Sequence, residues 1–409
     1  MNTRATLIER TLDNGMKIIV RENPLATDVS CQLNYKVSSR DESTDNAGIN
    51  TVMFRTLLKD STIGFPEDGI RKKGFFFDDF SSATQYIRPD QLDQAFERYC
   101  RVMISPVFTK ETLIRIIEAD QKSQKENRYH VSDRCNPTPF SALVFPVSGY
   151  GNPPYPTPIS AAQIDLQQVQ QWHQQFYSPE NAILVIVGNV NAEEVARLAT
   201  NYFNAVPARS TERTSDRQEL HEPGQRYIEL QMDTKLPRLL VAFNLPGIID
   251  PENRKTTPAL EVLAALLDQN ITNRLVACSG NCVYTPVRYA SVFKIFVTAM
   301  TCDQSLKELE VALNQWLQSI KDGTLSKGEL DAARESALSE LAAQQGQNDL
   351  LAYQLSVQEV NQLPLTDLDQ KRQELLNVAL ADIQSAASTY FTPQRMTVAH
   401  ILPMQEPAH

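Results

Sequence analysis

Residues 92–113, LDQAFERYCRVMISPVFTKETL, align without a gap on residues 309–330, LEVALNQWLQSIKDGTLSKGEL, at an offset of 217 positions. Both stretches predict an amphipathic helix followed by the start of a second helix, with Thr109 and Ser326 as the N-cap residues. Self-similarity at a fixed offset is the signature of a repeated structural unit. The chain is therefore expected to contain two copies of one fold.

A second pair of segments keeps nearly the same offset. Residues 169–187, VQQWHQQFYSPENAILVIV, match residues 383–402, IQSAASTYFTPQRMTVAHIL, with Pro179 and Pro393 separated by 214 positions. Each segment predicts a helix that ends in two aromatic residues, a turn with proline, and a strand rich in β-branched residues. Two matching blocks at almost the same offset favour duplication over chance.

Each copy opens on two predicted strands and continues mainly in helices, and the paired openings are residues 16–20 with 29–37 and 227–232 with 238–245. This order predicts the α+β class, with two homologous domains from internal duplication, each a mostly antiparallel sheet packed with helices. Residues 208–224, ARSTERTSDRQELHEPG, are polar and charged as in a linker. We therefore expect domains at 1–207 and 225–409.

Composition and charge exclude several classes of protein. The 409-residue chain has 39 basic and 49 acidic residues, so its formal charge of −10 disfavours binding to nucleic acid. Its longest apolar run, residues 182–187, is far shorter than the roughly 20 residues of a membrane-spanning helix, so no membrane span is expected. Charges at Arg4, Glu9, Arg10 and Asp13 disfavour a signal peptide. We expect a cytoplasmic protein, or a periplasmic one whose signal was removed.

Three stretches resemble the pitrilysin/insulinase-type metallopeptidases, the inverted zincins. They are residues 11–22, TLDNGMKIIVRE, residues 32–42, QLNYKVSSRDE, and residues 176–190, FYSPENAILVIVGNV. The first two are similar to the family's opening strands and the loop into its active-site helix, and the third is similar to its closing strand. The resemblance covers essentially the whole chain and implies the family's fold in both copies.

In active relatives the helix after that loop carries a His-x-x-Glu-His motif, in which two histidines bind zinc and the glutamate activates water. The matching segment here is residues 47–62, AGINTVMFRTLLKDST. Anchored on Gly48, the resemblance places the first histidine at Thr51, the glutamate at Phe54 and the second histidine at Arg55. A phenyl ring cannot act as a base, and a guanidinium is a permanent cation with donors only. Catalytic residues are therefore predicted to be absent.

The family's third zinc ligand is a glutamate on a later helix, which matches residues 110–127 here. The alignment places this ligand at Lys122, or at the residue after it, and neither is a carboxylate. Glu118 lies about one helical turn too early. An alternative, structural interpretation is that Arg55 and Lys122 pair with nearby carboxylates such as Glu118 or Asp120 and close the lost site.

In inactive members of the family, the second domain supplies an arginine and a tyrosine that hold the substrate near the partner's zinc. The matching segment is residues 272–286, TNRLVACSGNCVYTP, and its Tyr284 resembles the tyrosine. The arginine falls at Ala277, and the intervening loop is shorter than in the family. The resemblance thus implies Tyr284 as a substrate-binding residue, with Arg274 as the candidate to replace the missing arginine.

Residues 74–80, GFFFDDF, lie where the family's first domain has an edge strand that receives the substrate peptide by strand addition. The resemblance therefore implies Phe77 as a substrate contact. The alternative is that the phenylalanines fill core on one face of the strand and a partner interface on the other.

The cysteines and histidines offer only weak alternative sites. Six cysteines are too few for a disulfide framework in a chain of this length. Cys278 and Cys282, with Cys302 nearby, lack a close fourth ligand for zinc, so ordinary thiols are the favoured interpretation. Cys135 and His130 share a loop-like stretch with no orienting group for nucleophilic catalysis. We predict no metal and no other cofactor.

The leading functional hypothesis is a non-catalytic subunit that pairs with a homologous active zinc peptidase, or with itself, around a peptide substrate. The alternative is a stand-alone structural or peptide-binding assembly protein with no protease partner. A third hypothesis, a metallopeptidase with a rebuilt site, is disfavoured by the missing ligands.

Overall fold

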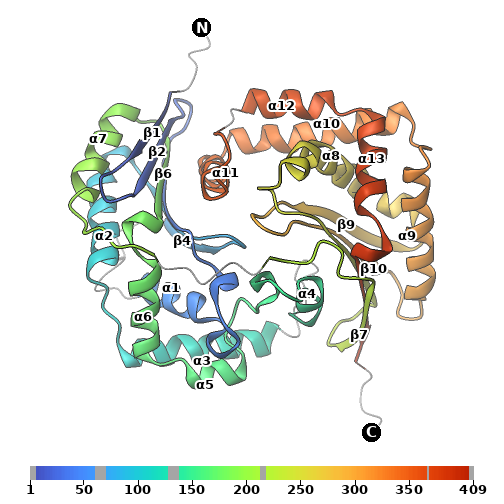
Figure 1. Cartoon of the computed structure of the whole chain (residues 1–409), viewed down its shortest axis with the longest axis horizontal. Helices are drawn as coiled ribbons and strands as arrows, with labels where there is room; N and C mark the ends of the chain where they lie inside the picture. Colours follow the sequence, from blue (N-terminus) through green and yellow to red (C-terminus); the bar gives the residue numbers. More distant parts are fainter. Residues whose placement is uncertain (1–5, 60–70, 128–137, 212–217, 366–367, 405–409) are drawn as a thin grey trace. The chain divides into compact units, whose positions relative to one another are not determined.

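The computed structural model describes residues 6–59, 71–127, 138–211, 218–365 and 368–404. The chain forms two compact units, and each unit is built on one mixed sheet packed with helices (Figure 1). Neither unit is continuous in sequence: unit 1 takes Met1–Lys122, Asn152–Asp216 and Ala343–Leu365, and unit 2 takes Ser123–Gly151, Arg217–Ala342 and Thr366–His409. The predicted α+β class is confirmed.

Unit 1 holds a six-stranded sheet in the order β1-β2-β6-β3-β5-β4. Only the β2 and β6 pair is parallel. The strands are β1 Leu7–Thr11, β2 Lys17–Glu22, β3 Val29–Tyr35, β4 Arg71–Phe76, β5 Ser81–Ile87 and β6 Ala182–Gly188. Its helices are α1 Ile49–Lys59, α2 Leu92–Ile104, α5 Pro158–Gln163, α6 Leu166–Phe176, α7 Ala192–Phe203 and α11 Asn348–Val360, together with the first part of α3 Lys110–Asn127.

Unit 2 holds a five-stranded sheet in the order β7-β11-β8-β10-β9, with β7 and β11 parallel. The strands are β7 Arg226–Met232, β8 Arg238–Asn244, β9 Cys278–Thr285, β10 Val292–Ala299 and β11 Met396–Pro403. Its helices are α4 Thr138–Val144, α8 Pro251–Arg274, α9 Leu306–Lys321, α10 Lys327–Gln345, α12 Leu368–Asn377 and α13 Leu380–Tyr390. Across the described residues, none of the helices is long and apolar enough to cross a membrane.

The two sheets share one topology, which confirms the duplication expected from the sequence. The order β2-β6-β3-β5-β4 of unit 1 corresponds strand by strand to β7-β11-β8-β10-β9 of unit 2, and β1 is an additional edge strand. The predicted helix starts also match. The amide of Thr112 donates to the Thr109 hydroxyl at 3.2 Å, and the amide of Glu329 donates to the Ser326 hydroxyl at 3.2 Å. Both N-caps are therefore confirmed.

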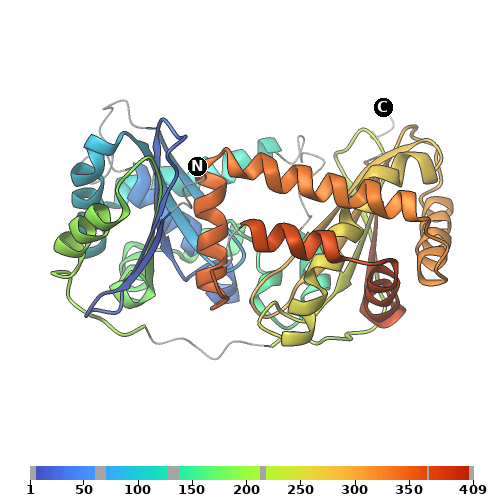
Figure 2. The ribbon, with the colours of Figure 1, turned by 90° about the horizontal axis from the view of Figure 1, so that it is seen from above.

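Strand β3 shows how the sheet of unit 1 is buried on both faces. Its alternate residues Cys31, Leu33 and Tyr35 belong to the main core cluster, together with residues of α1, α2, α6 and α7. Gln32 and Asn34 point to the opposite face, yet they are also buried. Figures 1 and 2 show the reason, because α11 lies across that opposite face and packs on β3 and β6.

A polar contact at the start of one helix recurs in both units. In unit 1 the Asn50 side-chain amide, at the beginning of α1, donates to the Ser81 hydroxyl at the start of β5 at 2.8 Å. In unit 2 the Asn253 amide, at the beginning of α8, donates to the Ser291 hydroxyl just before β10 at 3.3 Å. All four residues are buried. The duplicated units therefore fix the same helix against the same strand with the same pair of residue types.

Replacement of Asn50 by alanine tests this contact. The Asn50 carbonyl oxygen also accepts hydrogen bonds from the Trp172 indole at 3.4 Å and the Tyr177 hydroxyl at 3.5 Å. Because Asn50→Ala leaves these buried groups without their partner, we expect the free energy of unfolding to fall by about 2 to 4 kcal/mol in urea denaturation. Gln170→Ala on the exposed face of α6 is the control and is expected to change it by less than about 0.5 kcal/mol.

Candidate functional site

The three residues at the motif positions lie on α1, where Thr51 and Phe54 are buried and Arg55 is partly exposed. The Thr51 hydroxyl donates to the carbonyl of Pro154 at 2.6 Å. The Phe54 ring is 2% exposed and lies 5.3 Å, between ring centroids, from Phe76 in an edge-on contact. Position 54 is therefore part of the core of unit 1, and position 51 is held by the loop that follows η4 Gly149–Gly151.

Arg55, at the second histidine position, forms an ion pair with Asp120 of α3. The Asp120 side chain is fully buried, and the Arg55 guanidinium also lies 5.4 Å from the centroid of the Tyr155 ring. Glu118 and Lys122, on the same helix, are exposed. Of the two carboxylates expected from the sequence to pair with Arg55, the structure selects Asp120. A fixed cation thus stands where the resemblance places the second histidine, and a buried carboxylate balances its charge.

The N-terminus of α1 is held by groups of unit 1 itself. The Glu42 carboxylate accepts the amide hydrogens of Gly48 at 2.6 Å and of Asn50 at 2.9 Å. Gly48 has φ +84°, and a Cβ atom there would lie 2.1 Å from the nitrogen of Pro156. Glycine is therefore required at this position both by its backbone conformation and by the close approach of the loop. The helix keeps its position although its ligand residues are replaced.

The other histidines and cysteines were considered above as alternative sites. Within the residues that the structure describes, no group of three or more histidine, cysteine or acidic side chains is arranged to hold a metal ion. Cys278 and Cys282 lie on β9, where burial raises the pKa of both thiols, while Cys302 is exposed. Cys135 and His130 lie outside the described residues.

The expected substrate clamp is not assembled within unit 2. The Tyr284 hydroxyl lies 3.3 Å from the Thr257 hydroxyl near the start of α8, and burial raises the pKa of Tyr284 to about 12. Arg274, the last residue of α8, pairs with Glu329 of α10 at 2.5 Å. Thr257 and Arg274 are separated by about 25 Å along a helix that rises about 1.5 Å per residue. The two side chains are therefore not brought together.

Position 277, where the family's arginine would fall, holds a residue with an unusual backbone conformation. Ala277 has φ +52°, in the left-handed region that residues with a Cβ seldom adopt. It lies in the short connection between α8 and β9. The position where the resemblance places the arginine is thus a strained point of the backbone.

Phe77 follows β4, which is an edge strand of the unit 1 sheet as described. Its ring lies 4.6 Å from those of Phe80 and Tyr353 and 5.9 Å from that of Phe75, between centroids. Tyr353 belongs to α11, so this contact could not be inferred from the local sequence. Phe80 is buried and the other three rings are half-buried, and the role of Phe77 in peptide binding stays a prediction.

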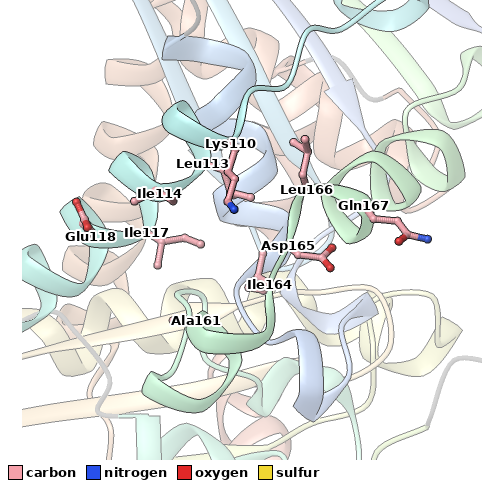
Figure 3. Close-up of a pocket in the computed structure, with 10 residues that line it drawn as sticks. All are labelled: Lys110, Leu113, Ile114, Ile117, Glu118, Ala161, Ile164, Asp165, Leu166 and Gln167. Atoms are coloured by element: carbon pink, nitrogen blue, oxygen red, sulfur yellow. The ribbon is translucent and has the colours of Figure 1, made fainter.

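One groove of about 460 Å³ opens on unit 1 between α3 and the junction of α5 and α6 (Figure 3). Its walls are mainly aliphatic, from Leu113, Ile114, Ile117, Ile164 and Leu166. None of the residues expected from the sequence to bind substrate lies in it. The groove therefore does not belong to the degenerate zinc position.

The duplicated α+β fold is the one that the resemblance to the inverted zincins implies, and α1 carries Thr51, Phe54 and Arg55 where that resemblance places the metal-binding motif. The family model described as the peptidase M16 inactive domain matches residues 163–337. The zinc protease PqqE from Helicobacter pylori is 22% identical over 424 residues, covering 96% of this chain and 92% of its own length. The chain is thus homologous to peptidases of the M16 family, and the match to the inactive-domain model lies within residues 163–337.

Solved structures share the fold over the whole chain. A protease from Helicobacter pylori aligns with a TM-score of 0.87 at 18% identity, covering 98% of this chain and 100% of that one. The periplasmic protease PqqL from Escherichia coli aligns with a TM-score of 0.78 at 16% identity. That alignment covers 97% of this chain but only 47% of PqqL, so PqqL is about twice as long.

The Arg55–Asp120 pair is tested by removing one partner and then both. Arg55→Ala leaves the Asp120 carboxylate buried without its cation, so we expect the free energy of unfolding to fall by about 3 kcal/mol. Adding Asp120→Asn removes the buried charge and is expected to restore most of that loss. A double-mutant cycle in urea measures the coupling, and strictly additive effects would contradict the pairing.

The pH dependence of stability tests the environment of Glu42. Burial raises the pKa of Glu42 to about 8, against the opposing effect of its two amide hydrogen bonds. Because this value lies above the ordinary 4.5, the stability from Glu42 is full below about pH 4.5 and is lost as pH rises through 8. Relative to Glu42→Gln, the wild type should lose up to about 1.4 kcal/mol per pH unit between pH 5 and 8. Glu111→Gln, at an exposed site, is the control and should show no such trend.

Proposed function

We propose that this chain is a non-catalytic subunit of a zinc metallopeptidase pair, which closes the peptide-binding chamber around an active homologous partner. One observation carries the proposal: the two-unit fold is intact, while its zinc helix holds Thr51, Phe54 and Arg55, with Arg55 paired to Asp120. A protein that had lost its role would not be expected to keep the surrounding elements so well packed.

The chemistry of the three residues supports a role without catalysis. Zinc requires neutral imidazole or anionic ligands, and Arg55 supplies neither. Phe54 has no proton to exchange with water, so the general base is missing as well. Hydrolysis is therefore assigned to the partner, and this chain contributes the walls of the chamber and the β4 edge for strand addition by a peptide.

The length relation to PqqL supports a pair. This chain corresponds to about half of PqqL, so a second chain of similar size would complete an assembly of the same extent. The partner class that we propose is a homologous chain with the His-x-x-Glu-His motif. PqqL is a periplasmic protease, which supports the periplasm among the two locations expected from the sequence.

A second candidate function is a structural or peptide-binding assembly protein with no protease partner. The observation that favours it is the unassembled clamp, since Tyr284 is buried against α8 and Arg274 is paired with Glu329. In this case both residues would serve only the stability of unit 2.

Mixing the chain with an active homologue distinguishes between the two proposed functions. The purified chain is mixed with a homologous chain that carries the intact motif, and peptidase activity is measured alongside native mass. We expect a stable 1:1 complex whose peptidase activity is at least about tenfold higher than that of the partner alone. This corresponds to a decrease of about 1.4 kcal/mol in the activation free energy. A chain that remains monomeric and leaves the partner's activity unchanged would rule out the pair.

Phe77→Ala tests the peptide-binding part of the proposal. Removal of this ring breaks up the aromatic cluster beside β4, so we expect the paired complex to bind a fluorescent peptide about tenfold more weakly in anisotropy titrations. Tyr227→Ala is the matched control, because Tyr227 is an exposed aromatic residue of unit 2. Equal affinities for the two variants would favour the purely structural interpretation of Phe77.

A further inference from the structure

The groove between α3 and the junction of α5 and α6 has no part in the proposed function (Figure 3). All of its lining residues belong to unit 1. On the α3 wall, Leu113 is buried in the core and Ile117 packs against that core, whereas Ile114 is 44% exposed. On α5, Ile159 lies two residues before the groove residue Ala161 and is 72% exposed. An aliphatic surface with polar residues at its rim is typical of a contact with another protein.

The outer ridge of α3 along this groove carries three residues at a spacing of four. Lys110, Ile114 and Glu118 are all exposed, and successive members lie about one turn apart on the same side of the helix. Figure 3 shows them in this order along α3. Because a helix rises about 1.5 Å per residue, the positions of Lys110 and Glu118 are about 12 Å apart. The ridge thus has a cation at one end, an aliphatic residue at its centre and an anion at the other end.

A two-fold axis through Ile114 makes this ridge complementary to itself. When two such ridges run antiparallel, Lys110 of one copy lies beside Glu118 of the other, and the reverse pair forms on the other side of the axis. The two Ile114 side chains then meet at the centre. Ridges formed by residues four positions apart pack in line with one another in the commonest class of helix contact. The order of charges on α3 therefore fits a second copy of the same helix.

The helix dipole adds to this complementarity. Lys110 is the first residue of α3, where the positive end of the dipole disfavours a cation and favours an anion. The Glu118 carboxylate of a second copy would lie at this end and offset both positive charges. The other acidic residue that lines the groove is Asp165, which accepts a hydrogen bond from the Gln168 amide at 2.8 Å and caps α6. Asp165 therefore already has a role within unit 1.

We propose that this groove is the contact surface of a homodimer, in which α3 of one copy lies antiparallel to α3 of the other about a two-fold axis at Ile114. Two Lys110–Glu118 ion pairs fix the direction and register of the helices. The aliphatic walls of each groove contact the Ile114 side chain of the other copy. This inference goes beyond the proposed function and does not rest on it, because the contact requires neither a peptide nor a homologous peptidase.

The mass of the purified chain is the first test. It is measured by size exclusion with light scattering between about 1 and 100 µM, because dimerisation depends on concentration by mass action. The expected result is a species of twice the 46.0 kDa of the chain at the upper concentrations. This species should dissociate on dilution and at high salt, since its ion pairs lie near the surface and are screened. A chain that stays at 46.0 kDa throughout would overturn the proposal.

Charge reversal tests the pairing and its direction. Lys110→Glu and Glu118→Lys each bring like charges together at both ends of the contact, so each is expected to weaken dimerisation at least about tenfold. An equal mixture of the two variants again pairs opposite charges at both ends. The mixture is therefore expected to form a heterodimer about as tightly as the wild type forms its homodimer. If the two variants do not restore each other, the ridges are not antiparallel and the proposal is wrong.

Ile114→Asp tests the apolar centre of the contact. Two carboxylates would then face each other across the axis, so dimerisation is expected to weaken at least about a hundredfold. Because Ile114 is exposed in the single chain, the variant is expected to fold, and circular dichroism and the midpoint of urea unfolding check this. Val311→Asp, at a similarly exposed aliphatic residue of α9, is the matched control and should dimerise like the wild type. An Ile114→Asp chain that dimerises as tightly as the wild type would overturn the proposal.

Discussion

Burial of the second face of each sheet is the constraint on which the rest of the structure depends. The unit 1 sheet has helices on one face, and on the other it presents Gln32 and Asn34 beside the aliphatic residues of β6. Buried amides are tolerated only when they are hydrogen-bonded, and α11 supplies those partners through Ser356 and the Asp349 carbonyl. The helix therefore completes the fold of unit 1, although it lies far along the chain.

The requirement that buried polar groups have partners also applies to α1. A metal site keeps its ligands charged or polar at the end of a helix, and loss of the metal would leave such groups without partners. Here Phe54 has joined the core, while Arg55 and Asp120 neutralise each other. Glu42 and Gly48 still fix the helix start. Contacts among protein groups therefore hold α1 in place along this stretch.

Much of the fold was predictable from local patterns. The offset between repeated segments predicted two copies, and the structure shows the same strand order in both. Thr109 and Ser326 were identified as N-caps because the side chain that caps a helix is adjacent in sequence to the amides it binds. The expectation that Thr51, Phe54 and Arg55 stand at the zinc-motif positions needed only the residue types at a known spacing. The edge position of the strand before Phe77 followed from the resemblance.

The amino-acid sequence by itself determined the duplication, the class of the fold and the residue types at positions 51, 54 and 55 of α1, because each depends on residues close together in the chain. Only the tertiary structure decided that Arg55 pairs with Asp120 and not with Glu118. Packing sets the rotation of α3 about its axis, and this rotation decides which of its side chains face α1. The tertiary structure also decided that Tyr284 and Arg274 lie at opposite ends of α8. The packing of α11 on the unit 1 sheet was equally hidden, because an amphipathic pattern shows that a helix needs an apolar partner but not which sheet provides it.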